Sequence, residues 1–236
     1  MIVRPLQPED LGQSSTIHLE VLRTEFLTRA GPRFLRRYHR AWIESDDAIA
    51  LAAVDAEDRV VGVLLGSTRP AHHYRAMVQR HGLQLSLLLL FQAVTHRSFA
   101  RELLITRGRR YTRGVLRMGV SGAKDLVRKN RNRQRSGADD LMAVQRAPQR
   151  VGEITHVMVR EELAGSGIGR ALLDAAENAG VQAGLDELVL VTMPGLPAAA
   201  FYEHLGWERV GDRRSQSGED FVQYRLSMVS RGQDPP

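Results

Sequence analysis

The sequence predicts an α/β domain in which one sheet is flanked by helices, and three observations carry this prediction. The first seventy residues read as a strand, one or two helices and two paired strands. Near the end of the chain, an apolar strand leads through a glycine-rich loop into an amphipathic helix. A segment that alternates apolar and polar residues then closes the domain. With 236 residues and 43% apolar content, the chain can bury a substantial core.

The N-terminal elements follow from local signals. Residues 2–7 predict a short strand, and residues 8–10 suit the first turn of a helix over residues 9–23. Gly31-Pro32 interrupts the helical pattern, which resumes from Phe34 to Trp42. Two apolar segments flank "DAED", residues 55–58, and predict a hairpin.

Residues 71–150 predict a basic helical insertion between the third and fourth strands. They hold 17 Lys and Arg residues but only 4 Asp and Glu residues. Leu83–Phe91 predicts a buried helix and Phe99–Ile105 another, whereas residues 107–150 predict an exposed or disordered loop. The apolar run that begins at Leu83 is shorter than the roughly 20 residues that span a bilayer, so no membrane segment is expected.

The C-terminal part predicts two helices and three strands. Strands are expected at residues 151–159, 186–193 and 221–229, and helices at residues 168–180 and 197–206. The domain is expected to cover residues 1–230, with 231–236 as a loose tail.

The sequence "AGSGIGR", residues 164–170, is typical of a phosphate-binding loop. The first N–H groups of a helix have no partner within the helix, and the helix dipole favours an anion there. Gly165, Gly167 and Gly169 let the backbone approach a phosphate without an intervening Cβ. No Gly-Lys-Ser/Thr follows, and the glycine spacing does not fit the dinucleotide fingerprint. A tight strand-to-helix turn without a ligand is the other interpretation.

Two motifs together resemble the GCN5-related N-acetyltransferases, the GNAT family. "VMVREELAGSGIGRALLDAA" is similar to the acetyl-CoA loop of that family, and "GLPAAAFYEHLGW" is similar to its second signature. The resemblance covers roughly residues 151–211. It implies a mixed, mostly antiparallel sheet flanked by helices. It also implies direct transfer of an acetyl group from acetyl-CoA to a primary amine of a small molecule or peptide.

The resemblance also implies where acetyl-CoA lies. The cofactor is expected between two strands that splay apart, residues 155–159 and 188–192, with pantetheine pairing near Val157 and Val159. A main-chain N–H near Met158 or Val159 is expected to stabilise the oxyanion. The cofactor-binding residues expected are Val157, Met158, Val159, Ala164, Gly165, Ser166, Gly167, Ile168, Gly169, Arg170 and Tyr202.

Tyr202 is the expected acid for the leaving thiolate, with a packed aromatic as the other interpretation. The base is expected to be Glu153 or His156, which a regular strand places on opposite faces. His72 and His73 are weaker candidates for lining the acceptor site.

Two positions depart from the family pattern. Ala164 stands where the family prefers Arg or Gln, and Gly195 stands where it often has Asn. Backbone N–H groups provide most of the binding in such a loop, so weaker acetyl-CoA binding is the largest effect expected from Ala164.

Composition excludes some kinds of site. The chain has no cysteine, which excludes disulfides and thiolate metal sites. The eight histidines show no ligand-type spacing with carboxylates, so no metal is expected. The N-terminus lacks a signal-peptide core, and a cytoplasmic location is expected.

The sequence does not decide the role of the insertion at residues 71–150. It is placed to form a lid, an oligomer contact such as a homodimer interface, or a solvated loop. A nucleic-acid-associated protein is a rival that the absence of a recognised motif disfavours. An acetyl-CoA sensor without transferase activity is a second rival.

Overall fold

The computed structural model describes residues 1–103, 150–195, 197–214 and 220–228. The chain divides into two compact units, residues 1–92 with 149–236, and residues 93–148. In the second unit the described part contains the end of α4 and the short helix α5 (Arg97–Glu102). The sheet and the helices that pack on it belong to the first unit.

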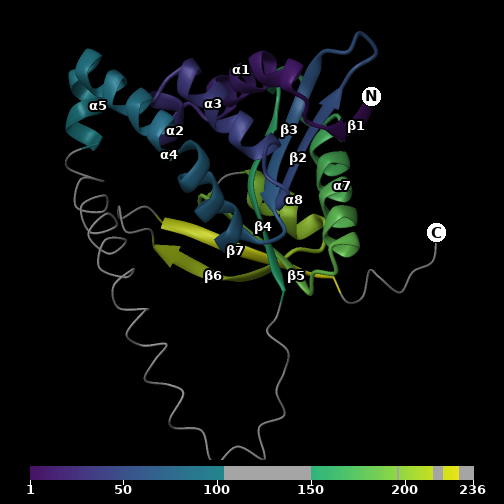
Figure 1. Ribbon diagram of the computed structural model, residues 1–236. Helices are drawn as coiled ribbons and strands as arrows, with labels where there is room; N and C mark the ends of the chain where they lie inside the picture. Colours follow the sequence, from purple (N-terminus) through teal and green to yellow (C-terminus); the bar gives the residue numbers. More distant parts are fainter. Residues whose placement is uncertain (104–149, 196, 215–219, 229–236) are drawn as a thin grey trace, which may run out of the picture. The chain divides into compact units, whose positions relative to one another are not determined.

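A seven-stranded mixed sheet forms the centre of this unit (Figure 1). Its strand order is β1-β2-β3-β4-β5-β7-β6. Only the β4–β5 pair is parallel, which confirms the expected mixed, mostly antiparallel sheet. The strands are β1 (Ile2–Pro5), β2 (Ala48–Val54), β3 (Val60–Ser67), β4 (Val151–Val159), β5 (Glu187–Thr192), β6 (Glu208–Arg214) and β7 (Asp220–Ser227).

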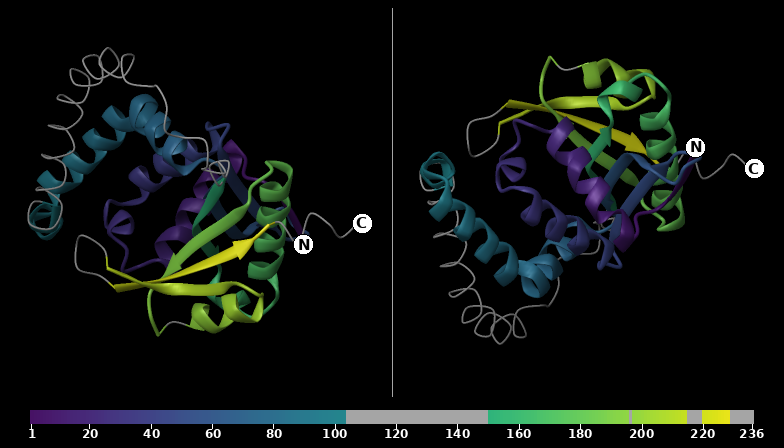
Figure 2. Two further views of the ribbon diagram at one scale, coloured as in Figure 1. Left: turned by 90° about the horizontal axis from the view of Figure 1, so that it is seen from below. Right: turned by 90° about the horizontal axis from the view of Figure 1, so that it is seen from above.

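Helices cover both faces of the sheet. Figure 2 shows α1 and α3 on one face and α7 on the other. The helices are α1 (Leu11–Val21), α2 (Phe26–Arg29), α3 (Pro32–Ile43), α4 (Pro70–Thr95), α7 (Ile168–Gln182) and α8 (Pro197–His204). Short 3-10 turns occupy Pro8–Asp10 and Glu161–Leu163.

The main core lies between α7 and the sheet. The α7 stripe contributes Leu172, Leu173 and Ala176, all fully buried. They pack with Leu188 of β5 and Tyr224 of β7. Each large apolar side chain buried in this way contributes about 1.5–3 kcal/mol to folding, so this stripe fixes α7 and the loop before it on the sheet.

The helix α4 differs from its prediction. Residues 83–91 are helical as expected, but they are not buried, since Leu83 is 76% exposed and Phe91 58% exposed. Only the N-terminal half of α4 enters the core, through His73, Met77 and His81. An apolar run alone does not tell a buried helix from an exposed one.

The structure also differs from two predictions for the C-terminal strands. The strand expected to be fully buried, β5, instead alternates, and Val191 is 47% exposed. The strand β6 was not predicted, because its sequence "ERVGDRR" is polar and its residues are mostly exposed. It forms the edge of the sheet, and β7 lies between it and β5.

Some predictions fall on undescribed residues. They are the loop over residues 107–150, apart from its last residue, and the tail at 231–236. Among the described helices, none is both long and apolar enough to cross a bilayer.

Candidate active site

The strands β4 and β5 are paired over only part of their length. Parallel pairing joins residues 151–154 of β4 to residues 187–190 of β5. Beyond Ile154, β4 continues to Val159 and pairs only with β3. The side of β4 that faces β5 therefore offers main-chain groups over residues 155–159, where the expected opening between the two strands lies.

The ladder with β3 decides which of these groups face the opening. Arg160 N donates to Val61 O (3.1 Å), which makes this a hydrogen-bonded pair. In an antiparallel ladder such pairs alternate with pairs whose N–H and C=O groups point away. Because Gly62 lies opposite Val159 and Leu64 opposite Val157, the main-chain groups of Val157 and Val159 point toward the opening. Met158 directs its main chain toward β3.

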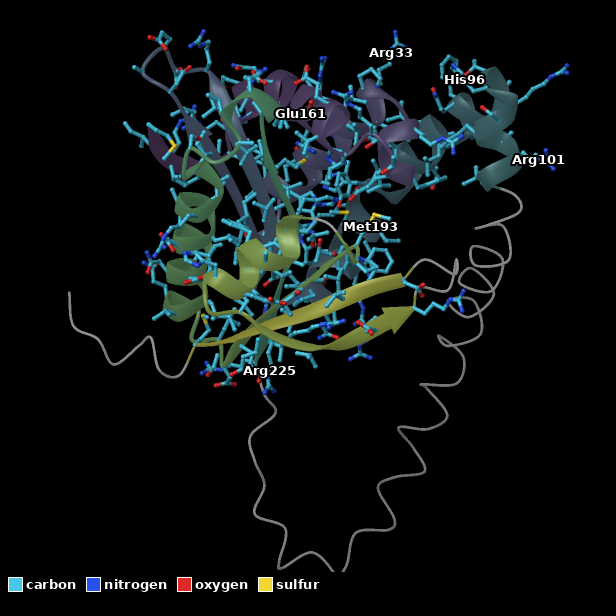
Figure 3. The ribbon with its side chains drawn as sticks, turned by 180° about the vertical axis from the view of Figure 1, so that it is seen from behind. Arg33, His96, Arg101, Glu161, Met193 and Arg225 are labelled. Atoms are coloured by element: carbon cyan, nitrogen blue, oxygen red, sulfur yellow. The ribbon has the colours of Figure 1, made fainter. Side chains whose placement is uncertain are left out.

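The loop between β4 and α7 is left-handed at two of its glycines. Gly165 and Gly167 have φ angles of +79° and +84°, a left-handed conformation that favours glycine. A Cβ at either position would find no atom within 4 Å, so the loop surface is open there. Figure 3 shows Glu161 at the start of this connection.

The first turn of α7 presents backbone donors on this open surface. Gly167 is the N-cap, and the first intrahelical bond runs from Ala171 N to Gly167 O (3.0 Å). The N–H groups of residues 168–170 therefore precede the hydrogen-bonded part of the helix and can bind an anion. The guanidinium of Arg170 adds positive charge and lies 3.6 Å from Asp174.

The helix α8 lies beside this loop and carries Tyr202. A Cβ on Gly169 would meet Phe201 of α8 at 3.4 Å. The Tyr202 ring packs on Trp207 and Tyr224, and burial raises the pKa of its hydroxyl to about 12. The hydroxyl has no hydrogen-bond partner among the described residues. It therefore carries its proton at neutral pH and is free to donate it.

A β-bulge in β4 changes one prediction about the base. Leu65 pairs with His156 and Gly66 with Ile154, so Thr155 is an extra residue in β4. The extra residue shifts the alternation by one, and Glu153 and His156 therefore share a face of the sheet. The prediction of opposite faces was wrong because it assumed a regular strand. A Cβ on Gly66 would lie 2.8 Å from Glu153 O, so the bulge needs glycine there.

Glu153 is half-buried and lies near His156 and Tyr74. Burial raises the pKa of its carboxyl above its ordinary value, although the nearby His156 opposes this effect. Tyr74 of α4 reaches the same region, where its hydroxyl lies 3.2 Å from Thr155 Oγ1. A carboxylate with a raised pKa can accept a proton at neutral pH more readily than a solvated one.

His156 instead faces two side chains that the sequence analysis did not select. Its Nε2 lies 3.3 Å from Oε2 of Glu25, in the connection between α1 and α2. The same oxygen lies 3.8 Å from Nε2 of His18 in α1. Glu25 is partly exposed, but His18 and His156 are buried. Although burial opposes ionisation, the two histidines lower the pKa of Glu25 to about 2.

A hydrogen-bonded chain continues from His18 into the core. His18 Nδ1 lies 3.0 Å from His39 Nε2, and His39 Nδ1 lies 3.0 Å from Ser14 Oγ. His18 and His39 are fully buried, and burial lowers the pKa of each. Both are therefore neutral at physiological pH. We call His18, Glu25, His39 and His156 the histidine cluster.

The comparisons with known proteins agree with this geometry. Residues 135–207 match the model of the acetyltransferase (GNAT) family. This segment of the chain therefore resembles a GNAT acetyltransferase domain. No curated protein sequence matches the chain.

Solved GNAT structures share the fold along nearly the whole chain. A chimera of spermidine N-acetyltransferase SpeG from Vibrio cholerae and hSSAT superposes with a TM-score of 0.56 at 12% identity, covering 99% of this chain and 98% of that one. Ribosomal-protein-S18-alanine N-acetyltransferase from Escherichia coli gives 0.52 at 12% identity, covering 100% and 98%. Polyamine N-acetyltransferase of Drosophila melanogaster gives 0.53 at 15% identity, covering 96% and 99%. At these identities the likeness concerns the fold.

The two weaker candidates, His72 and His73, lie in the first turn of α4. His73 is buried against the Trp42 ring (4.1 Å between centroids) and lies 2.8 Å from Ser45 Oγ. His72 contacts Asp47. Both histidines therefore have partners in the segment that follows α3, and their place at the acceptor site stays a prediction.

No sequence signal marked Glu25, His18 or His39 as functional residues. They lie on or between helices without a motif, and they meet His156 only in the folded chain. The change from helix to connection near Leu22 was visible, but nothing local marked Glu25 as a partner of β4.

Proposed function

We propose that this chain transfers the acetyl group of acetyl-CoA directly to a primary amine of a small molecule or peptide. The observation that carries the proposal is the combination of an unpaired β4 edge with an open glycine loop at the start of α7. Pantetheine would pair with the main chain of Val157 and Val159, and the diphosphate would lie on residues 164–170. The protein is expected to act in the cytoplasm.

The chain's own groups supply the polar chemistry of the transfer. The amine nitrogen attacks the thioester carbonyl and forms the C–N bond, and the C–S bond breaks when the resulting oxyanion collapses and expels the thiolate. The N–H of Val157 or Val159 would stabilise the oxyanion, because these groups face the opening. Met158, the other predicted donor, is less suited, since its main chain points toward β3.

Tyr202 is our proposed acid. Its raised pKa keeps the proton on the hydroxyl until the thiolate leaves, and it lies on α8, whose Phe201 packs against Gly169. The competing interpretation is a purely packed aromatic. Tyr224 provides the contrast, since its hydroxyl already donates to Glu203 (2.9 Å).

Glu153 is our proposed base. The raised pKa of its carboxyl suits proton transfer from an ammonium group at neutral pH. His156 is less suited, because its Nε2 already faces the ionised Glu25 at 3.3 Å. The solved relatives act on a ribosomal-protein alanine, spermidine and polyamines, and all of these acceptors present a primary amine.

Two measurements test this proposal. Acetyl-CoA at a hundred times its Kd should stabilise the chain by about 2.7 kcal/mol. A protein of this size then melts roughly 5–11 °C higher, at about 2–4 °C per kcal/mol. A thiol-release assay with amino acids, amino sugars, polyamines and peptides should identify the acceptor. Absence of any thermal shift at large excess would contradict acetyl-CoA binding, and binding without turnover would instead favour a sensor.

A further inference from the structure

We propose that His18, Glu25 and His156 bind one divalent transition-metal ion, for which Zn²⁺ is the best fit. The site lies on the α1 and α3 face of β4 and goes beyond the proposed acetyl transfer. One ligand atom from each of the three residues lies within 4.8 Å of the other two. Two imidazole nitrogens with one carboxylate oxygen form a known Zn²⁺ donor set.

Two of the three distances between ligand atoms are close to those expected around one shared ion. Two ligand atoms bound about 2.0–2.1 Å from one tetrahedral Zn²⁺ lie about 3.3 Å apart. His156 Nε2 and Glu25 Oε2 are 3.3 Å apart, and His18 Nε2 and the same oxygen are 3.8 Å apart. The second distance is too long for a hydrogen bond. A shift of about half an ångström would bring it to the value for a common ion.

The buried chain behind His18 favours a free lone pair on Nε2. If His18 Nδ1–H donates to His39 Nε2, then His39 Nδ1–H can donate to Ser14 Oγ. The Ser14 hydroxyl can in turn donate to Leu11 O (3.4 Å). The reverse direction would leave a buried N–H on His18 Nε2 with its nearest acidic oxygen 3.8 Å away.

This arrangement is typical of a metal-binding histidine. Such a residue usually donates its second ring N–H to a neighbour, which fixes the tautomer and the ring orientation. His18 is fully buried, its Nε2 has no hydrogen-bond partner, and this nitrogen is directed at Glu25. A buried polar atom without a partner is costly, and an ion would satisfy it.

The electrostatic environment also suits a cation. No lysine or arginine is paired with Glu25 in the described part of the chain, where its carboxylate faces only His18 and His156. The carboxylate of Asp47 differs from that of Glu25. Arg69 Nε lies 2.7 Å from it and already supplies a positive charge there.

A bound ion would join three distant segments. Glu25 lies between α1 and α2, His18 on α1, and His156 beside the bulge of β4. The ion would hold the α1–α2 connection on β4. Three protein ligands would leave a coordination position for water or another small donor.

The test is a titration of the tag-free, full-length chain, first freed of metal with a chelator. We expect calorimetry to show one Zn²⁺ per chain, and Co²⁺ to give the visible absorption of a tetrahedral site. Glu25→Gln and His156→Gln should each abolish this binding. His39→Gln should weaken it about 10- to 100-fold with the stoichiometry unchanged, as expected for a residue that orients a ligand.

A matched control is His81→Gln. His81 is also buried and lies 3.5 Å from Glu44, but no second histidine completes that pair. This variant should bind Zn²⁺ like wild type. Circular dichroism checks the fold of each variant, and the partly exposed Glu25 carries the test if a histidine variant does not fold.

Two results would overturn the metal site. One is a wild-type chain that takes up no Zn²⁺ or Co²⁺. The other is Glu25→Gln and His156→Gln proteins that bind as tightly as wild type, which would place the ion elsewhere. The acetyl-CoA thermal shift is measured separately on the same protein. Loss of the metal result with that shift retained would leave the proposed acetyl transfer intact.

Discussion

The two proposed sites on either side of β4 are built from different groups. Toward β5 and α7, the proposed cofactor site is built from main-chain groups and from glycines in a short stretch of sequence. Toward α1 and α3, the histidine cluster is built from side chains that are up to 138 positions apart, from His18 to His156. A site made of backbone can be recognised in a local motif. A site made of distant side chains becomes visible only in the folded chain.

The largest effect is expected on the cofactor side, from Tyr202→Phe. Loss of a general acid should lower kcat about 10²- to 10⁴-fold, while the acetyl-CoA Kd changes little. Tyr224→Phe is the control, because that hydroxyl bonds to Glu203 and lies outside the proposed chemistry. Equal turnover by Tyr202→Phe and wild type would reduce Tyr202 to a packed aromatic.

Glu153→Gln tests the other side of β4. Removing the base should lower kcat/KM about 10²-fold or more. The base must be ionised, so wild-type kcat/KM should fall as the pH drops through a pKa above 4.5, the ordinary glutamate value. This fall of kcat/KM at low pH should be absent in the Glu153→Gln variant. A variant that keeps this fall at low pH would assign it to a group other than Glu153.

Glu153→Gln should also change how the stability of the fold depends on pH. A carboxyl with a raised folded-state pKa binds more protons in the folded chain, so it lowers stability as the pH rises through that pKa. Glu153→Gln should therefore melt at a higher temperature than wild type near pH 7, and the gain should vanish below the unfolded-state pKa. A lower melting temperature at pH 7 would indicate that the carboxylate is structural.

Gly167→Ala should have a moderate effect on the loop. Its φ of +84° costs a residue with a Cβ about 1–2 kcal/mol. Acetyl-CoA should bind roughly 5- to 30-fold more weakly if the loop relaxes to avoid this strain. Gly12→Ala is the matched control, because Gly12 lies in α1 with nothing within 4 Å of its added Cβ. Calorimetry with acetyl-CoA compares the two.

Ala164→Gln should give the smallest change, and in the opposite direction. The family usually has Arg or Gln here, and one added hydrogen bond is worth about 1 kcal/mol. Acetyl-CoA should then bind about fivefold more tightly. Ala164→Leu adds bulk without a donor and should give no gain. Equal affinities for the Gln and Leu variants would mean that the backbone alone holds the diphosphate.

The sequence determined the order of elements and the glycine loop. Hydrophobic periodicity located α7 and most strands, and the motif at residues 164–170 required glycine whatever surrounded it, because its backbone is left-handed at Gly165 and Gly167. The helix that carries Phe201 and Tyr202, and Gly206 just past its end, could also be recognised from neighbouring residues. These features depend on residues that are neighbours in the chain, so they can be recognised without the fold.

Tertiary structure decided the rest. Thr155 entered β4 as a bulge only because β3 offered Gly66 opposite it, and this brought Glu153 and His156 to one face. The exposed face of α4 and the polar edge strand β6 also depended on which neighbours were present. The spacing of histidines predicted no metal, yet folding placed His18, Glu25 and His156 together, because ligand geometry depends on distance in space and not along the chain.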